Sequence, residues 1–300
     1  MTDISGERPA ALRLWFLAAR PRTLGAAAAP VIMGTALAAT AGGAHVLSAL
    51  AALLGAMLIQ IGANFANDYF DFVKGADTAA RLGPTRATQA GWVTPVQMRN
   101  ATALVLFAAF LVGLYLVWRG GWPILLIGVL SLLFAVLYTG GPYPLGYLGL
   151  GDLFVFVFFG PVAVAGTFYV QRLEWSWLPV WAGVAPGLFS MAILAVNNLR
   201  DVDEDRRTGK RTLAVRLGPG FARFEHAACI VTGAVLVPLL LCMAVPGHWA
   251  AMVSAMVLLP ASRAIRAVHR QSGAPLNAQL GATGKLLLLH SLLFSAGWLW

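Results

Sequence analysis

The residues with the clearest capacity for chemistry are carboxylates that follow directly on an apolar run. Residues 63–78 read ANFANDYFDFVKGADT and contain Asp68, Asp71 and Asp77. Helical spacing of i, i+4, i+8 and i+11 would place four polar side chains on one face, namely Gln60, Asn64, Asp68 and Asp71. Polar groups at such a depth are costly unless they face a cavity or a bundle interior. We therefore expect this face to line a functional site.

A second acidic cluster has a similar pattern. It comprises Asp201, Asp203, Glu204 and Asp205. Asn197 precedes Asp201 by four residues, which is the spacing of Asn64 and Asp68 in the first cluster. Spacing of i, i+3 and i+7 would also give this cluster a shared helix face, made of Asn198, Asp201 and Asp205. One such cluster alone is often only a solvated helix end, whereas two of them favour a common site.

Two facing stripes of carboxylates would repel each other unless a cation lay between them. Mg²⁺ is the natural candidate, because it takes oxygen ligands and commonly bridges one or two carboxylates to the phosphates of a substrate. The basic side chains beside the clusters could clamp a diphosphate; they are Lys74, Arg81, Arg86, Lys210 and Arg211, with Arg20 and Arg22 from the N-terminal segment. Next to apolar helices, this pattern indicates a lipid diphosphate, and a reaction in which the diphosphate leaves.

Aromatic residues could line the apolar part of such a cavity and shield an allylic cation from water. The candidates are Tyr138, Tyr143, Tyr147 and the run FVFVFFG at 154–160. The Phe run on its own fits lipid-facing or core packing better than site lining. The five histidines have no metal-ligand spacing near a cysteine, so we assign them no role.

Composition places these clusters in an integral membrane protein. Apolar residues make up 59% of the chain and charged residues only 11%. A membrane-crossing helix needs about 20 mainly apolar residues, and nine runs qualify: 23–41, 46–66, 100–118, 122–139, 151–170, 178–198, 225–245, 248–262 and 280–299. The run 248–262 is the weakest, being short and interrupted by Pro260. We expect an all-α bundle of nine transmembrane helices around a central cavity.

The distribution of charge predicts the orientation. With nine crossings, 19 of the 21 Lys and Arg residues fall in the segments on the N-terminal side, and only Arg119 and Arg172 fall opposite. This is the positive-inside pattern, so the N-terminus and both acidic clusters are expected to face the cytoplasm. The net charge of +9 is therefore explained by topology and contact with the lipid bilayer, and a nucleic-acid partner is not expected.

The two clusters also suggest a weak internal repeat. Each is followed by a basic segment that contains glycine. The chain would then be one membrane-embedded domain, 1–300, with repeats at about 23–139 and 151–262 and a ninth helix at 280–299.

Several motifs in the same order resemble the UbiA superfamily of intramembrane prenyltransferases, and within it the 1,4-dihydroxy-2-naphthoate polyprenyltransferases of menaquinone biosynthesis. The matching stretches are ARPRTL, NDYFDFVKGADT with RLGPTRATQAGWVTP, YTGGPYPLGYLGLGD with FFGPVAVAGTFYVQ, and NNLRDVDEDRRTGKRTLAVRLG. They cover residues 18–225. The wider superfamily usually spaces its first motif as NDxxDxxxD, whereas Gly75 stands here four residues after Asp71 and the third acid comes at Asp77. This departure is similar to the naphthoate branch.

The resemblance implies a bacterial inner-membrane enzyme with its active site toward the cytoplasm. By similarity, the metal ligands for Mg²⁺ and the catalytic acids would be Asn64, Asp68, Asp71, Asn197, Asp201 and Asp205. The substrates, polyprenyl diphosphate and dihydroxynaphthoate, would be bound with the help of Asn198, Asp77, Tyr138 and the bases Arg22, Arg81, Arg86, Lys210 and Arg211. The ring would attack the allylic carbon and lose its carboxylate as CO₂, giving demethylmenaquinone. Tyr138 and Asp152 are candidates for accepting a proton.

Three alternatives stay open. The acceptor could be 4-hydroxybenzoate, although the spacing of the first motif disfavours it, or the donor could be phytyl diphosphate. A transporter could use intramembrane acids as a cation or proton path. Relay acids usually lie near the midplane, whereas these acids group at one surface with Arg and Lys. Prenyl chain length and oligomeric state are not determined by these patterns.

Overall fold

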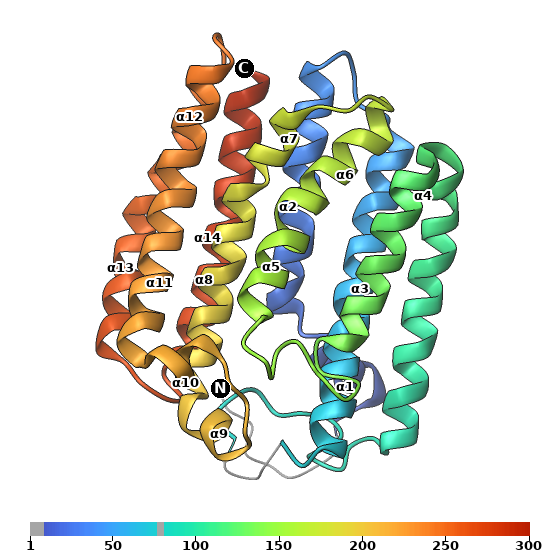
Figure 1. Ribbon diagram of the computed structural model, residues 1–300, viewed down its shortest axis with the longest axis vertical. Coiled ribbons are helices and arrows are strands. Elements are labelled where there is room, and N and C mark those ends of the chain that lie inside the picture. The colour runs from blue at the N-terminus through green and yellow to red at the C-terminus, as the bar shows by residue number, and fades with distance from the viewer. Residues whose placement is uncertain (1–8, 77–80) are drawn as a thin grey trace.

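The protein is a bundle of helices that run side by side along one long axis (Figure 1). The computed structural model describes residues 9–76 and 81–300, and these residues form helices and turns without a β-strand. Eight helices are long and apolar enough to cross a membrane; their bounds are Pro21–Thr40, Val46–Val73, Pro95–Leu137, Gly151–Arg172, Trp177–Arg200, Pro219–Ala244, Trp249–Arg270 and Leu276–Leu299. The expected all-α architecture is confirmed, and the described residues contain eight candidate membrane-spanning helices where nine apolar runs were expected.

The third of these helices, α4 (Pro95–Leu137), turns back on itself. It begins with a capping box in which Thr94 and Gln97 bond each other's backbone, and Pro95 occupies its first turn. A straight helix of 43 residues would be about 65 Å long, roughly twice the hydrocarbon thickness. Gly121 breaks it with φ 67° and ψ −153°, a conformation that glycine adopts without strain. Its two legs correspond to the expected runs 100–118 and 122–139.

Two neighbouring crossings are also interrupted, and their breaks touch. The first consists of α5 (Gly151–Phe159) and α6 (Pro161–Arg172), and the second of α7 (Trp177–Ala182) and α8 (Val184–Arg200). A Cβ on Gly160 would lie only 2.5 Å from the carbonyl oxygen of Gly183, so only glycine permits this approach. The breaks therefore fix the position of α5 against α8.

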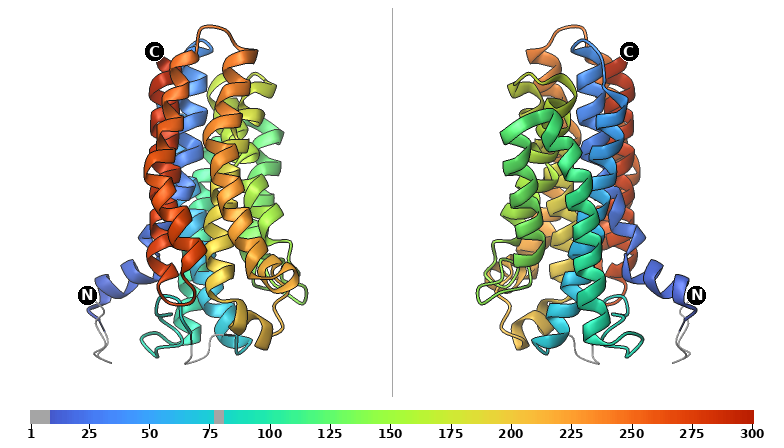
Figure 2. Two further views of the ribbon diagram at one scale, coloured as in Figure 1. Left: turned by 90° about the vertical axis from the view of Figure 1, so that its left-hand side faces the viewer. Right: turned by 90° about the vertical axis from the view of Figure 1, so that its right-hand side faces the viewer.

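The other elements complete the bundle. Ahead of α4 in the sequence lie α1 (Ala11–Ala18), α2 (Pro21–Thr40) and α3 (Val46–Val73). Short helices α9 (Val202–Arg207) and α10 (Leu213–Leu217) follow α8. The chain ends with α11 (Pro219–Val231), η1 (Thr232–Leu236), α12 (Val237–Ala244), η2 (Trp249–Val257), α13 (Leu258–Arg270) and α14 (Leu276–Leu299). Figure 2 shows α1, α9 and α10 at the same end of the bundle and the C-terminus at the other end.

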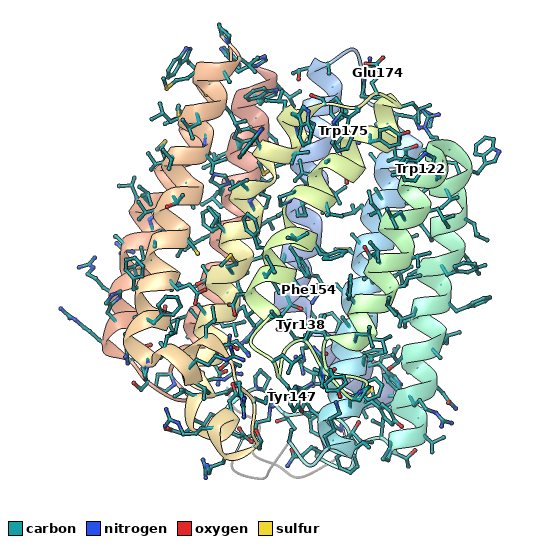
Figure 3. All side chains as sticks on the ribbon, in the orientation of Figure 1. Trp122, Tyr138, Tyr147, Phe154, Glu174 and Trp175 are labelled. Carbon is teal, nitrogen blue, oxygen red and sulfur yellow. The ribbon has the colours of Figure 1, made fainter. Side chains whose placement is uncertain are left out.

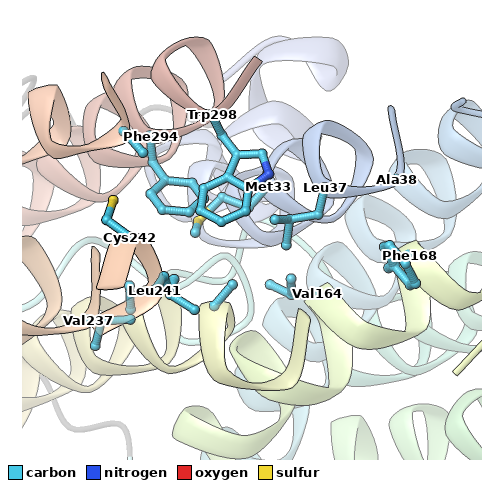
Figure 4. Packing of buried hydrophobic residues seen from close by; sticks show 13 residues of the cluster. Met33, Leu37, Ala38, Val164, Phe168, Val237, Leu241, Cys242, Phe294 and Trp298 are labelled. Carbon is cyan, nitrogen blue, oxygen red and sulfur yellow. The ribbon is translucent and has the colours of Figure 1, made fainter. Parts of the chain in front are cut away.

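One cluster of buried side chains joins α2, α6, α12 and α14 (Figure 4). Met33 and Phe294 are fully buried there, and the Trp298 indole donates a hydrogen bond to Thr40 Oγ1 at 3.0 Å. The His248 ring stacks on Trp298 with centroids 4.2 Å apart. By contrast, only 11% of the apolar window in α4 is buried, against 61% in the crossing that contains α8. The bundle thus has a packed half and a half whose outer helices are open to lipid.

We expect Gly34→Ala to lower the thermal unfolding midpoint of the detergent-solubilised protein. A Cβ at position 34 would lie 2.7 Å from the carbonyl oxygen of Val164 and would push α2 away from α6. Overpacking of this kind costs about 1–3 kcal/mol. Gly113→Ala is the matched control, because nothing lies within 4 Å of its added methyl group. An equal midpoint in both variants would contradict the packing described for α2 and α6.

Candidate active site

A cavity of about 480 Å³ lies between α2, α3, α4, α5, α6 and α8. The part of the cavity at the end that carries α9 and α10, here called the mouth, is lined by residues from both acidic clusters, including Asn64, Asp71, Asn197, Asn198, Asp201 and Asp205. Basic and phenolic groups from the intervening loops line the same mouth, namely Arg81, Arg86, Lys210, Tyr138 and Tyr147. The fold therefore brings together polar residues that are more than 130 positions apart in the sequence.

Asp71 is the centre of the mouth. Its carboxylate accepts hydrogen bonds from Arg86 Nη2 at 2.8 Å, Tyr147 Oη at 2.8 Å and Lys210 Nζ at 3.3 Å. The Lys210 ammonium also lies 4.7 Å from the centre of the Tyr147 ring, within cation–π range. One carboxylate thus joins three loops, each of which supplies a donor.

Asp68 lies one turn before Asp71 but has different surroundings. Its oxygen atoms accept hydrogen bonds from the backbone N–H groups of Ala87 and Thr88, at 2.9 and 3.1 Å. It is buried and is not among the residues that line the cavity. Asp68 thereby holds the segment that carries Arg86 against α3.

The second cluster is organised by a residue that the sequence patterns did not indicate. Arg200 is buried and forms a bidentate pair with Asp201, with Nε at 2.7 Å from Oδ1 and Nη2 at 2.5 Å from Oδ2. It also donates to Asn197 Oδ1 and to Asn277 Oδ1, each at 2.8 Å. The Asn277 amide in turn donates to the carbonyl of Leu82 at 2.7 Å. Arg200 therefore connects the end of α8 to α14 and to the loop after α3.

Asp205 is the least compensated acid of the mouth. Burial raises its pKa to about 7, and the negative charges of Asp201, Asp71 and Glu204 act in the same direction, while Lys210 opposes them. Burial and neighbouring negative charge both favour the protonated form of such a carboxyl group, and a bound cation would favour the ionised form. The site therefore attracts further positive charge.

Tyr138 lies in the wall between the polar mouth and the apolar interior. Figure 3 shows Tyr147, Tyr138 and Phe154 in this order from the loop end toward the middle of the bundle. Burial, reinforced by the charges of Asp152, Asp205 and Asp71, raises the pKa of the Tyr138 phenol. Tyr138 consequently keeps its proton at neutral pH, which suits a hydrogen-bond donor and not a base. Asp152 is buried nearby but does not line the cavity.

Aromatic side chains cover much of the apolar interior. Phe134 of α4 packs against Phe154 and Phe158 of α5, with ring centroids 4.6 and 5.3 Å apart. These three rings and Phe159 line the cavity. The expectation that the Phe run mainly serves lipid-facing or core packing was therefore wrong for three of its members.

Other residues from the sequence interpretation lie away from the cavity. Arg22 is not a lining residue; it lies against Gly281 of α14. The side chain of Arg211 is exposed, and its backbone N–H bonds the carbonyl of Tyr147 at 2.8 Å. Lys74 donates to the carbonyls of Thr139 and Gly141 and so holds the loop after α4. Asp77 falls outside the described residues.

The oxygen-bearing side chains of the mouth fit a divalent cation whose remaining coordination positions are filled by a bound ligand. Within residues 9–76 and 81–300, no three His, Cys, Asp or Glu side chains are grouped as a ready-made metal site. The mouth nevertheless holds Asp71, Asp201 and Asp205 with the amides of Asn64 and Asn197. Mg²⁺ is commonly bound by one or two carboxylates together with substrate phosphates, so an incomplete protein shell of this kind suits it.

Comparisons with known proteins point to one family. Residues 27–293 match the UbiA prenyltransferase family. The chain is 40% identical to a 1,4-dihydroxy-2-naphthoate octaprenyltransferase of Mycobacterium tuberculosis, covering 93% of this chain and 94% of that protein. It is 38% identical to the enzyme of the same name from Escherichia coli, covering 94% of both. A solved UbiA homolog from Archaeoglobus fulgidus, bound to DMAPP and Mg²⁺, has a TM-score of 0.60 at 12% identity and covers 94% of this chain and 99% of its own.

The contacts of Asp68 generate a local prediction. Asp68→Asn should accelerate amide hydrogen exchange in the segment around Ala87 and Thr88, because the new NH₂ group cannot accept one of the two backbone hydrogen bonds. Asp203→Asn is the control, since Asp203 is exposed at the same end of the bundle. Unchanged exchange at Ala87 and Thr88 would show that Asp68 does not hold this segment.

Proposed function

The chain belongs to the UbiA prenyltransferase family, and we propose that it transfers a polyprenyl group from an allylic diphosphate to 1,4-dihydroxy-2-naphthoate. The observation that carries this proposal is the composition of the cavity. Carboxylates and bases from both acidic clusters meet at its mouth, and an apolar, Phe-lined space continues behind them. A ligand with an anionic head and a long apolar tail matches both parts.

Binding of the donor is assigned to the mouth. Arg81, Arg86 and Lys210 would hold oxygen atoms of the diphosphate, since guanidinium and ammonium groups bind phosphate through charge-assisted hydrogen bonds. Arg86 and Lys210 now bond Asp71, so a bound diphosphate would share these cations with that carboxylate. Asp71, Asp201 and Asp205 would hold Mg²⁺, and Asn64 and Asn197 would contribute their amide oxygen atoms. The ion would supply positive charge that stabilises the leaving diphosphate. Asp68 and Arg200 position this set.

The interior would favour cleavage of the allylic carbon–oxygen bond. The electron pair of that bond leaves with the diphosphate, and the positive charge that develops on the allylic carbon faces Phe134, Phe154 and Phe158. The ring carbon of the acceptor that carries the carboxylate then forms the new carbon–carbon bond. Loss of CO₂ returns its electron pair to the ring and leaves the prenylated quinol, the reduced form of demethylmenaquinone. The Tyr138 hydroxyl would orient the acceptor by hydrogen bonding.

We place the mouth at the cytoplasmic face of a bacterial inner membrane. If the two legs of α4 are counted as separate crossings, the chain would cross nine times, and α1 and the C-terminus lie at opposite ends of the bundle (Figure 2). The end with the acidic clusters also carries the loops that hold most of the Lys and Arg residues. Positive charge of this kind faces the cytoplasm.

Activity is tested with purified protein, a polyprenyl diphosphate, Mg²⁺ and acceptor labelled with ¹⁴C in its carboxyl group. We expect labelled CO₂ and a prenylated quinol in equal amounts, and chelation by EDTA should stop both. A panel that includes 4-hydroxybenzoate and phytyl diphosphate tests the related acceptor and donor directly by product mass. Turnover that favours 4-hydroxybenzoate, or that continues in EDTA, would contradict the proposal.

Substitution in either cluster should abolish most turnover while the protein still inserts in membranes. We expect Asp71→Asn and Asp205→Asn each to lower kcat by about 10²–10³, the usual effect of removing one electrostatic contact to the transition state. Arg200→Lys should lower turnover less and raise the Mg²⁺ concentration needed for half-maximal rate, because Lys cannot form the bidentate pair with Asp201. Asp203→Asn, whose side chain is exposed, is the control and should retain activity.

A further inference from the structure

Two basic residues lie together on the outer surface of the bundle, away from the cavity. A Cβ on Gly281 would lie 3.8 Å from Arg22 Cδ, so the Arg22 side chain of α2 runs along α14 at this point. Lys285 follows Gly281 by four residues and therefore projects from the same face of α14, one turn further on. Lys285 is exposed, and neither residue lines the cavity.

A groove adjoins Lys285 on the side of α13. It has a volume of about 230 Å³ and is lined by Pro260, Ala264, Ala282, Leu286 and Leu289, with Lys285 at its edge. Its walls are almost wholly apolar, and Lys285 is its one basic lining residue. The groove thus combines an apolar surface with a single base.

The depth of this surface in the membrane is indicated by α1. This helix projects sideways from the bundle (Figure 2), with Leu12 89% and Phe16 64% exposed on its outer side, while Leu14 and Ala18 are buried. Short helices with an exposed apolar face lie in the interface between lipid headgroups and acyl chains. Only Ala19 and Arg20 separate α1 from the start of α2. Arg22 is therefore at the level of the headgroups, and the long side chain of Lys285, one turn further along α14, can extend to the same level.

Within residues 9–76 and 81–300, no carboxylate forms an ion pair with these bases. From His226 to Trp300 the sequence contains neither Asp nor Glu. In the part of the chain that the structure describes, neither Arg22 nor Lys285 has an ion pair or a side-chain hydrogen bond. The positive charge at this depth is then complemented by phosphate groups of the surrounding lipid.

We propose that Arg22 and Lys285 bind the phosphate of an anionic phospholipid, one of whose acyl chains lies in the groove between α13 and α14. The two bases contact the phosphate of the headgroup from adjacent helices, α2 and α14. The small side chains of Ala264 and Ala282 leave room in the groove for an acyl chain. The site is separate from the cavity, so it does not depend on the prenyl-transfer proposal.

The test uses the full-length protein, equilibrated with vesicles of equal parts dioleoyl phosphatidylglycerol and dioleoyl phosphatidylcholine, and native mass spectrometry of the bound lipid. We expect the wild type to retain phosphatidylglycerol preferentially. Lys285→Gln and Arg22→Gln should each reduce this preference by about fivefold, since a base near the membrane surface contributes about that factor. Lys285→Arg should preserve it.

Arg99→Gln is the matched control, because Arg99 is exposed on α4 at the same end of the bundle. Ala282→Leu should reduce retention of both lipids by filling the groove. Equal retention of the two lipids by the wild type would overturn the proposal, as would a loss of preference in Arg99→Gln as large as that in Lys285→Gln. A change from dimer to monomer in Lys285→Gln with unchanged lipid preference would instead assign the groove to a second copy of the chain.

Discussion

Compensation of buried carboxylates is the interaction on which the loop end of this protein depends. Asp71 is paired with Arg86 and Lys210 and Asp201 with Arg200, while Asp68 accepts hydrogen bonds from backbone N–H groups. Removing one partner from a buried pair of this type commonly costs about 3–5 kcal/mol, because the other charge is left buried and unpaired. The contacts that hold the loops in place are therefore also the contacts that present charge to a ligand. Asp205 is the member whose raised pKa shows that compensation is incomplete.

The two halves of the bundle have different roles. The half made by α2, α8 and the last helices is tightly packed, with Met33, Phe294 and Trp298 at its centre. The other half, made by α3, both legs of α4, α5 and α6, encloses the cavity against α2 and α8, and the apolar surfaces of α3 and α4 are little buried. A rigid scaffold on one side and a lipid-facing wall on the other suit a substrate that enters from the membrane with its tail.

Helical periodicity was sufficient to predict the parts of the site that depend on single helices. The polar stripe through Asn64 and Asp71 lines the cavity, and the run of nonpolar residues on each side of Gly121 agrees with the two legs of α4. Because apolar runs and charge spacing are local properties, they could also suggest that both clusters belong to one end of the bundle.

The remaining features depend on contacts between distant segments. Asp68 and Asp71 share a helix face, yet the loop after α3 meets Asp68 with backbone N–H groups and Asp71 with the Arg86 side chain. The role of Arg200 depends on Asn277, 77 residues further along the chain. The Phe run lines the cavity only because the adjoining breaks at Gly160 and Gly183 fix α5 beside α8. None of these arrangements has a signature in spacing or composition, although a base directly before a motif acid, as at Arg200, is a signal that could be searched for.

The central claim is that α3 and the α8–α9 segment act on one diphosphate through a divalent cation. Equilibrium binding of an unreactive prenyl thiolodiphosphate, measured by titration calorimetry with and without Mg²⁺, tests it most directly. The account predicts tight binding only with Mg²⁺, and loss of the metal-dependent part in Asp71→Asn and in Asp205→Asn alike. Metal-independent binding in the wild type, or metal-dependent binding that survives in either variant, would contradict it.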